Sequence, residues 1–254
     1  MRGDGLNVAR PWIKLGRREG AKPPMKNQPM PPALKGLPKA LAERLWAEAT
    51  LMSATDGRTV VALGARSTSV YVVLEGRVQV TLFSLGGREV ILRDLGEGEM
   101  FGELAAIDGH PRSASIVALS DCQLASIPAE AFRAAVAETP EGAMWLAKRL
   151  TAQVRDLTER VFELNALRVR SRLHCELLRL CGTADQRADG VTLEPTPTHA
   201  ELASRVGTHR EAVTREIGYL VDQGIIRQER RRMTVLDMQA LTQLVRMATG
   251  EHHV

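Results

Sequence analysis

The hydrophobic pattern of this 254-residue chain changes its period near Pro128, and this change most constrains the fold that the chain can adopt. From Thr59 to that point apolar and polar residues alternate, as they do over residues 77–82, which is typical of strands with one buried face. Beyond Pro128 the apolar spacing is helical as far as about Cys181. We therefore expect an α+β fold in which a β-rich half precedes a helical half.

Turn signals divide the β-rich half into short segments. They lie at residues 75–76, 86–87, 96–98 and 108–109. Short strands at this spacing predict a small antiparallel sandwich or barrel. This β domain is expected to cover residues 39–138.

A basic and proline-rich segment, residues 1–38, precedes the β domain. It carries eight Lys or Arg residues and two acidic residues, a net charge of +6, whereas the whole chain has a net charge of +4. A segment of this composition buries too little apolar surface to fold alone, so it is predicted to be a flexible extension. Because the basic excess lies there, the net charge of the chain is no evidence for a nucleic-acid partner.

Composition and motifs exclude several classes of protein. The three cysteines, Cys122, Cys175 and Cys181, have no CxxC spacing, and their odd number argues for reduced thiols without a disulfide framework. The sequence has no metal-ligand motif, P-loop or Ser/His/Asp grouping, so neither a metal site nor an enzyme is expected. No apolar run approaches the ~20 residues that span a bilayer, and there is no secretory signal, so we expect a cytoplasmic protein without membrane contact.

Apolar residues at heptad spacing predict a dimerisation helix over residues 139–168. They follow one another at the a/d intervals of a coiled-coil seam: Leu150, Val154, Leu157, Val161 and Leu164. This length is too short for a long coiled coil but sufficient for one dimer seam, so a homodimer is expected. The alternative is a helix that packs on its own domain.

The region 169–246 is predicted to be a winged helix-turn-helix. Thr198 and Glu201 have the spacing of a capping box, which starts a short helix. Gly207 supplies the permissive backbone that a tight turn between two helices requires. Thr208 is expected to start the second helix.

The second helix is amphipathic. One face, formed by Val213, Ile217 and Leu220, can pack on the preceding helix. The opposite face holds four polar residues near the helix N-terminus: Arg210, Glu211, Thr214 and Arg215. A recognition helix meets base edges of the major groove at this end, where Arg can bind guanine O6 and N7 and Glu can accept from cytosine N4. The alternative is an exposed face on which Glu211 only completes a capping box with Thr208.

A two-stranded wing is predicted after the second helix. Strand-like residues 225–227 and 233–236 flank an arginine-rich tip. Arg230 and Arg231 are expected to contact DNA phosphates, which positions a domain without reading the base sequence. A C-terminal tail, residues 247–254, is expected to follow.

The segment 207–215, Gly-Thr-His-Arg-Glu-Ala-Val-Thr-Arg, resembles the recognition-helix motif of the CRP/FNR family of bacterial transcription regulators. The resemblance implies double-stranded palindromic DNA with TGTGA-like half-sites, read by Arg210, Glu211 and Arg215. It also implies a homodimer and RNA polymerase as a further partner. Thr214 stands where part of the family has a small residue, which leaves the outer bases of the half-site open. Further DNA contacts are expected at Thr198, Thr208 and His209.

A second motif lies in the β-rich half, over residues 98–116. Gly102 permits close approach of the backbone, and a helical turn after it would present free N–H groups to an anion. Arg112 can form a charge-assisted bond to a phosphate, Ser113 adds a hydroxyl donor, and Glu103 can accept from sugar hydroxyls. The alternative is a surface arginine at position 112 with Glu103 as its ion-pair partner.

This motif resembles the phosphate-binding cassette of cyclic-nucleotide-binding domains, where Phe-Gly-Glu-Leu is followed by Arg-Ser/Ala-Ala. The resemblance implies a β-roll fold, with Gly102 and Glu103 at the ribose and Arg112 with Ser113 at the cyclic phosphate. Leu104 belongs to the same cassette. The presence of both the Glu and the Arg favours a functional nucleotide site.

The base of such a nucleotide would lie against the long helix, where the family's Thr-Ser pair corresponds to Leu157 and Thr158. The loss of the first hydroxyl weakens the selectivity for adenine, whereas Thr158 could still bond a purine edge from either protomer. Cyclic AMP is the first choice of effector and cyclic GMP the second, and no cofactor is required. Alternatives keep the DNA-binding regulator but replace the input by haem or nitric oxide, a redox signal or another small molecule, or make it ligand-independent.

Overall fold

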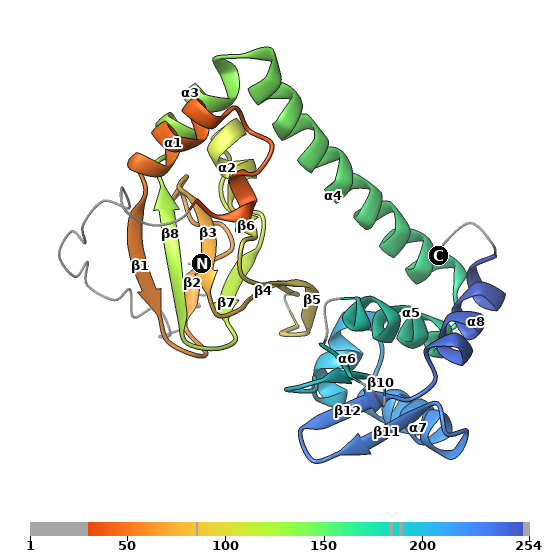
Figure 1. Cartoon of the computed structure of the whole chain (residues 1–254). Coiled ribbons are helices and arrows are strands. Elements are labelled where there is room, and N and C mark those ends of the chain that lie inside the picture. Colours follow the sequence, from red (N-terminus) through yellow and green to blue (C-terminus); the bar gives the residue numbers. More distant parts are fainter. Residues whose placement is uncertain (1–29, 85, 183–184, 188–189, 251–254) are drawn as a thin grey trace, which may run out of the picture.

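The computed structural model describes residues 30–84, 86–182, 185–187 and 190–250, of which residues 185–187 by their backbone only. In this part of the chain a β domain, a long helix and a C-terminal domain follow one another (Figure 1). The α+β class predicted from the sequence is confirmed, with an antiparallel β-roll, a long helix and a winged helix-turn-helix in that order.

Two four-stranded antiparallel sheets form the β domain. The first has the order β1-β8-β3-β6, with bounds Thr50–Ala54, Cys122–Ile127, Val70–Glu75 and Met100–Phe101. The second has the order β2-β7-β4-β5, with bounds Thr59–Val61, Ser115–Ala118, Val78–Phe83 and Glu89–Leu95. Side chains of both sheets, among them Val73, Leu95 and Leu124, form one buried cluster. Gln79 and Thr81, on the polar side of the predicted alternation, are buried as well.

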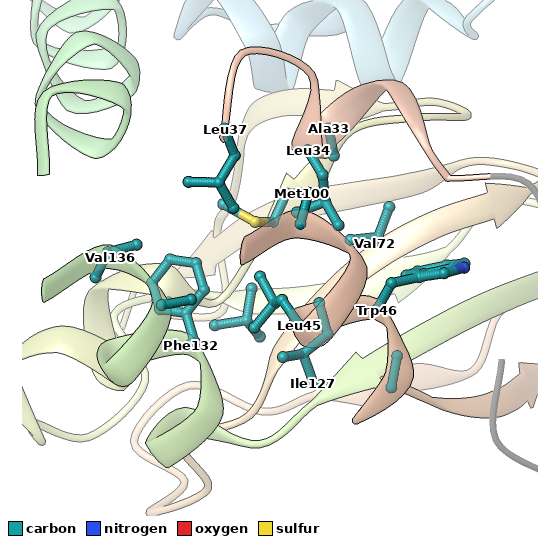
Figure 2. Close-up of a cluster of buried hydrophobic side chains, with 14 of the residues drawn as sticks. Ala33, Leu34, Leu37, Leu45, Trp46, Val72, Met100, Ile127, Phe132 and Val136 are labelled. Atoms are coloured by element: carbon teal, nitrogen blue, oxygen red, sulfur yellow. The ribbon is translucent and has the colours of Figure 1, made fainter. Parts of the chain in front are cut away.

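Short helices cover the first sheet and form a second apolar core with it. They are the 3-10 turn η1 (Pro32–Leu34), α1 (Lys39–Ala47) and α3 (Ala129–Ala137), and α2 (Glu103–Asp108) follows β6. Figure 2 shows this core, in which Leu45, Ile127 and Phe132 come from α1, β8 and α3. These three side chains are among the largest that are fully buried.

The predicted flexible extension is shorter than residues 1–38. Residues 1–29 lie outside the described part of the chain, but Ala33, Leu34 and Leu37 are buried in the second core (Figure 2). The backbone O of Lys35 also accepts a hydrogen bond from Trp145 Nε1 at 3.1 Å. The prediction is therefore wrong for residues 32–37, because the composition of the whole segment concealed a short apolar stretch at its end.

The long helix α4 (Pro140–Ala166) begins on the β domain and runs to the C-terminal domain (Figure 1). The Thr139 side chain caps it by accepting from the backbone N–H of Gly142 at 3.1 Å. At 1.5 Å per residue, its 27 residues span roughly 40 Å. Four of the five heptad residues, Val154, Leu157, Val161 and Leu164, are more than half exposed in the single chain. This exposure argues against the alternative of a helix packed on its own domain.

The C-terminal domain contains four helices and one antiparallel sheet in the described residues. The helices are α5 (Val169–Cys181), α6 (His199–Val206), α7 (Arg210–Asp222) and α8 (Met238–Thr249). The sheet has the order β11-β12-β10-β9, with bounds Ile226–Glu229, Arg232–Val235, Gly190–Leu193 and Asp185–Arg187. Leu173, Leu202 and Ile217 join its helices in one buried core.

Part of the predicted tail is helical. Residues 247–249 complete α8, which Gly250 ends with a φ of +78°, and residues 251–254 lie outside the described part. The buried Leu241 and Val245 show why the helix forms, since one of its faces packs on the domain. Among the described residues, no helix has the length and apolar character needed to cross a membrane.

Candidate functional sites

A cavity of about 610 Å³ lies between the second sheet, α2 and α4. It is lined by six of the seven residues predicted to bind the ligand: Gly102, Glu103, Leu104, Arg112, Ser113 and Leu157. The seventh, Thr158, does not line it, and its exposed Oγ1 donates to the backbone O of Val154 at 2.8 Å. The structure therefore brings the cassette and one turn of the long helix to one cavity.

Arg112 is held in place by the β domain. Its Nη1 donates to the backbone O of Gly102 at 2.9 Å and its Nη2 to the backbone O of Ser69 at 2.6 Å. Its Nε donates to Ser67 Oγ at 3.1 Å, and the guanidinium lies 5.7 Å from the centre of the Tyr71 ring. Arg112 is only 4% exposed, so the alternative interpretation of residue 112 as a surface arginine is wrong.

The burial of Arg112 has two consequences. It lowers the pKa of Arg112 from its ordinary value, against the opposing effects of Tyr71 and Glu103. It also explains Gly102, because a Cβ at that position would lie 2.5 Å from Arg112 Nη1. Gly102 has a φ of +87°, a conformation that glycine adopts readily, so both its backbone and the space beside it require glycine.

Glu103 is buried beside this arginine and has an unsatisfied oxygen. Its Oε1 accepts from Gln153 Nε2 at 2.8 Å, whereas its Oε2 has no hydrogen-bond partner among the described residues. A buried carboxylate oxygen without a donor is unfavourable, so this atom is suited to accept a hydrogen bond from a molecule in the cavity. The sequence reasoning missed Gln153, although it lies four residues before Leu157 and so on the same helix face.

Two neighbouring residues of β5, Leu92 and Arg93, both line the cavity, although neighbours on a strand normally point to opposite faces. A bulge accounts for this, since Val80 pairs with Arg93 and Thr81 with Ile91. Leu92 is then the extra residue, and a bulge of this kind redirects side chains. The side chain of Arg93 forms no hydrogen bond or ion pair within the described residues.

The end of the cavity nearest the C-terminus of α4 carries charged groups. They are contributed by α4 and α5: Asp156, Glu159, Arg160 and Arg179. The sequence reasoning missed these residues, because charged side chains on a helix are usually solvated. Only the approach of α5 to α4 brings them together at one wall.

The turn of the helix-turn-helix is formed as predicted. Thr198 Oγ1 accepts from the backbone N–H of Glu201 at 3.2 Å, and the Glu201 side chain accepts from the backbone N–H of Thr198 at 2.6 Å, which completes the capping box. Gly207 has a φ of +67°. The second helix begins at Arg210 instead of Thr208, because the Thr208 N–H still bonds to Ala203 O at 3.0 Å and closes the first helix.

The two faces of α7 are divided as predicted. Val213, Ile217 and Leu220 are buried in the domain core. The side chains expected to read DNA are exposed on the other face, together with His209 at the N-cap: Arg210, Glu211, Thr214 and Arg215. The capping-box alternative for Glu211 is not formed, because Thr208 lies outside the N-cap position.

A chain of side-chain hydrogen bonds joins the wing to both helices. Gln228 Nε2 of β11 lies 3.0 Å from His199 Nε2, and His199 Nδ1 lies 2.8 Å from Thr214 Oγ1. The Gln228 amide donates, so the His199 ring carries its proton on Nδ1 and donates it to Thr214. His199 was not singled out from the sequence, since neither partner is near it in the chain.

The wing places its arginines at the tip between β11 and β12. Arg230 and Arg231 are exposed there, and Arg231 has a φ of +65°. Arg232 instead forms an ion pair with Glu194 at 2.9 Å. Among the described residues no group of three His, Cys, Asp or Glu side chains could hold a metal ion.

Two families of domains match the chain. Residues 51–139 match the cyclic nucleotide-binding domain, and residues 171–244 match the Crp-like helix-turn-helix domain. The first match contains the cavity residues of the cassette, and the second contains α6, α7 and the wing. The two matches therefore coincide with the two candidate sites.

Two relatives match two thirds or more of the chain. The chain is 30% identical over 193 residues to the CRP-like cAMP-activated global transcriptional regulator of Mycobacterium tuberculosis, covering 75% of this chain and 85% of that protein. It is 32% identical over 172 residues to the cyclic AMP receptor protein of Thermus thermophilus, covering 68% and 77%.

Solved structures of the same family resemble the fold of this chain. A transcriptional regulator of the CRP/FNR family from Thermus thermophilus superposes with a TM-score of 0.64 at 30% identity, over 77% of this chain and 97% of that one. FixK2 from Bradyrhizobium japonicum superposes with a TM-score of 0.70 at 19% identity, over 77% and 96%, which is a likeness of fold.

Proposed function

The chain belongs to the CRP/FNR family of DNA-binding transcription regulators, and we propose that it is a homodimeric regulator whose DNA affinity is controlled by a cyclic nucleotide. The observation that carries the proposal is the pair of buried groups at one end of the cavity. Arg112 supplies a fixed cationic donor for a phosphate, and Glu103 Oε2 supplies an acceptor that no described residue satisfies. A cyclic nucleotide carries both matching groups, a phosphate and a neighbouring sugar hydroxyl.

Cyclic AMP is the first choice of effector. The two relatives described above are named for cyclic AMP. Leu157 would offer an apolar contact to the face of the base but no hydrogen bond that distinguishes adenine from guanine. The choice of adenine therefore rests on the relatives.

Cyclic GMP is the second candidate, and Arg93 favours it. A guanidinium pairs well with guanine O6 and N7, which are both acceptors, whereas adenine presents an amino donor in place of O6. Asp156 lines the same cavity and would accept from the N–H groups on the other edge of guanine. Arg93 and Asp156 together complement guanine better than adenine.

Dimerisation is proposed to occur along α4. The exposed apolar stripe of Val154, Leu157, Val161 and Leu164 would be buried against the same stripe of a second copy. Thr158 lies outside its own cavity, so its predicted contact with the base would have to reach the cavity of the partner. Two recognition helices in such a dimer would meet half-sites about one turn of DNA apart.

The regulation is proposed to be a shift between two arrangements of the DNA-binding domains. An effector that contacts the cassette and α4 together favours the arrangement in which both are correctly placed. Such coupling typically amounts to about 1–3 kcal/mol, or roughly 5- to 150-fold in DNA affinity. RNA polymerase is a proposed further partner of the DNA-bound dimer.

Fluorescence anisotropy with a palindrome of two TGTGA half-sites tests the proposal. Titrations without nucleotide, with cyclic AMP and with cyclic GMP are compared at fixed salt, because phosphate contacts make affinity salt-dependent. We expect one nucleotide to change the affinity at least about fivefold. Equal affinity in all three titrations would contradict nucleotide control and favour another input, such as haem, nitric oxide or a redox signal. Failure to prefer the palindrome over random DNA would contradict the proposed target.

A further inference from the structure

The C-terminal domain is attached to the β domain by a buried ion pair as well as by the chain. Arg205 of α6 donates from Nη2 to both carboxylate oxygens of Asp94 on β5, at 2.7 and 2.6 Å. The side chains are 3% and 11% exposed. Within the β domain Gln79 Nε2 also donates to Asp94 Oδ1 at 3.0 Å, which fixes the carboxylate toward Arg205. The first helix of the DNA-reading unit is thus bonded directly to the domain that holds the cavity.

Glu176 of α5 extends this pair to the cavity. Its side chain is 2% exposed, and its Oε1 lies 3.4 Å from Arg205 Nη1. Its Oε2 lies 3.7 Å from Arg160 Nη2 and forms a second ion pair with Arg179. Arg160 and Arg179 line the cavity. Asp94, Arg205, Glu176, Arg160 and Arg179 therefore form one interdomain ion-pair network.

The network approaches the cavity from a second side through β5. Arg93 lines the cavity, and the next residue, Asp94, bonds to Arg205. The bulge described above directs the two side chains to the cavity and to the C-terminal domain. A bound molecule that displaces Arg93 would therefore shift the backbone that carries Asp94.

Buried ion pairs of this kind respond sharply to small shifts. Separating two desolvated charges leaves each of them without a partner in a medium of low polarity, which is strongly unfavourable. Arg205 depends on these two carboxylates, because its buried Nε has no acceptor among the described residues. The network is therefore either formed or broken, and intermediate positions of α6 are disfavoured.

We propose that the interdomain ion-pair network transmits occupancy of the cavity to the helix-turn-helix. Acceptor groups of an effector that contact Arg160 or Arg179 compete with Glu176 for these cations and change how tightly Glu176 and Asp94 hold Arg205. The position of α6, and with it that of α7, then depends on the contents of the cavity. This inference rests on the proposed nucleotide control. The experiment below distinguishes a failure of the network from a failure of nucleotide control.

The substitution Asp94→Asn tests the network in the full chain, because it keeps the shape of the side chain and removes its charge. DNA affinity is measured by anisotropy with and without cyclic AMP and cyclic GMP, and nucleotide affinity by calorimetry. We expect Asp94→Asn to bind nucleotide as the parent does, while the nucleotide-induced change in DNA affinity falls at least about fivefold. Arg77→Ala is the matched control, because it removes the ion pair that exposed Arg77 forms with Asp94 at 3.4 Å inside the β domain and keeps the pair of Asp94 with Arg205, so it should leave the response unchanged.

A full response in Asp94→Asn would overturn the inference. If the parent itself shows no nucleotide response, the proposed control fails, and hydrogen exchange without nucleotide still tests the network. We then expect faster exchange in α6 and in residues 167–168, between α4 and α5, for Asp94→Asn than for the parent or Arg77→Ala. Equal exchange in all three proteins would show that the ion pair does not hold the domain.

Discussion

Glu103 Oε1 accepts a hydrogen bond from Gln153 Nε2 at 2.8 Å, and this bond joins the first turn of α2 to the middle of α4. The two residues are 50 positions apart in the chain. The bond occupies one carboxylate oxygen and leaves the other, Oε2, buried without a donor among the described residues. The proposed site for a sugar hydroxyl thus uses the same side chain that contacts the long helix.

The substitution Glu103→Gln is expected to weaken nucleotide binding. It replaces a charged acceptor by a neutral amide, and hydrogen bonds to charged groups contribute about 1.5–3 kcal/mol, or roughly 10- to 150-fold in affinity. Calorimetry with cyclic AMP and cyclic GMP measures the loss. Glu97→Gln, at an exposed residue of the turn before β6, is the control and should bind as the parent does. Unchanged affinity in Glu103→Gln would exclude Oε2 from the site.

The substitution Arg93→Ser is expected to change the choice of base. If Arg93 donates to guanine O6 and N7, its loss should lower cyclic GMP affinity by roughly 1–3 kcal/mol, about 5- to 150-fold, and affect cyclic AMP less. Competition binding with both nucleotides measures the ratio. Arg88→Ser, at an exposed arginine before the same strand, should leave the ratio as it is. A parallel loss for both nucleotides would assign Arg93 to the phosphate instead.

Arginines of the recognition helix and of the wing are expected to behave differently. Arg210→Ala should cost about 1–3 kcal/mol and relax the preference at one base pair of the half-site. Arg231→Ala should weaken binding to all sequences about equally and reduce the dependence of affinity on salt. Anisotropy against a set of single-base variants, at several salt concentrations, distinguishes the two. An Arg210→Ala protein with the parent's preference would remove α7 from the reading of bases.

A charge in the exposed stripe of α4 is expected to prevent dimerisation. Val161 is 58% exposed in the single chain and would be buried in a dimer, so Val161→Glu would bury an unpaired carboxylate. We expect the dimer dissociation constant to rise by roughly 100-fold or more. Sedimentation equilibrium measures it, with Lys148→Glu on the opposite side of α4 as the control. A stable Val161→Glu dimer would place the interface elsewhere.

The thiols of α5 are expected to be inert in the folded protein. Burial raises the pKa of Cys175 and of Cys181 to about 11 each. Their thiolate fraction at pH 8 is then more than about 100-fold below that of an ordinary thiol, and alkylation by iodoacetamide, followed by peptide mapping, should be slow until the chain unfolds. Rapid alkylation of the native protein would contradict this burial.

The same shift predicts a loss of stability at alkaline pH. The unfolded thiols release their protons near pH 8.5, whereas the folded thiols keep them until about pH 11. Between these values the unfolded state binds fewer protons, so the free energy of unfolding falls as the pH rises. Denaturant titrations from pH 8 to pH 10 measure the slope, and its reduction in a Cys175→Ala and Cys181→Ala double variant identifies the source.

The sequence by itself determined the elements whose signals are local. The capping box of Thr198 and Glu201, the turn at Gly207 and the two faces of α7 follow from residues a few positions apart, and the structure confirms them. Gly102 and Arg112 were identified by the resemblance of one short segment, and both line one cavity. In the helix-turn-helix the partners lie in one turn or one helix, so spacing alone specifies the geometry, whereas the cassette was identified by its likeness to a known motif.

Only the tertiary structure decided the contacts between distant segments. Arg205 and Asp94 are 111 positions apart, and each has the pattern of an ordinary surface charge in its own segment. Three other features also depend on contacts that no local pattern predicts. They are the burial of Leu34 and Leu37, the bulge that places Arg93 at the cavity, and the hydrogen bond from Gln153 to Glu103. A local pattern specifies which face a residue occupies, but the identity of its partner depends on how whole elements pack, and that is a property of the complete fold.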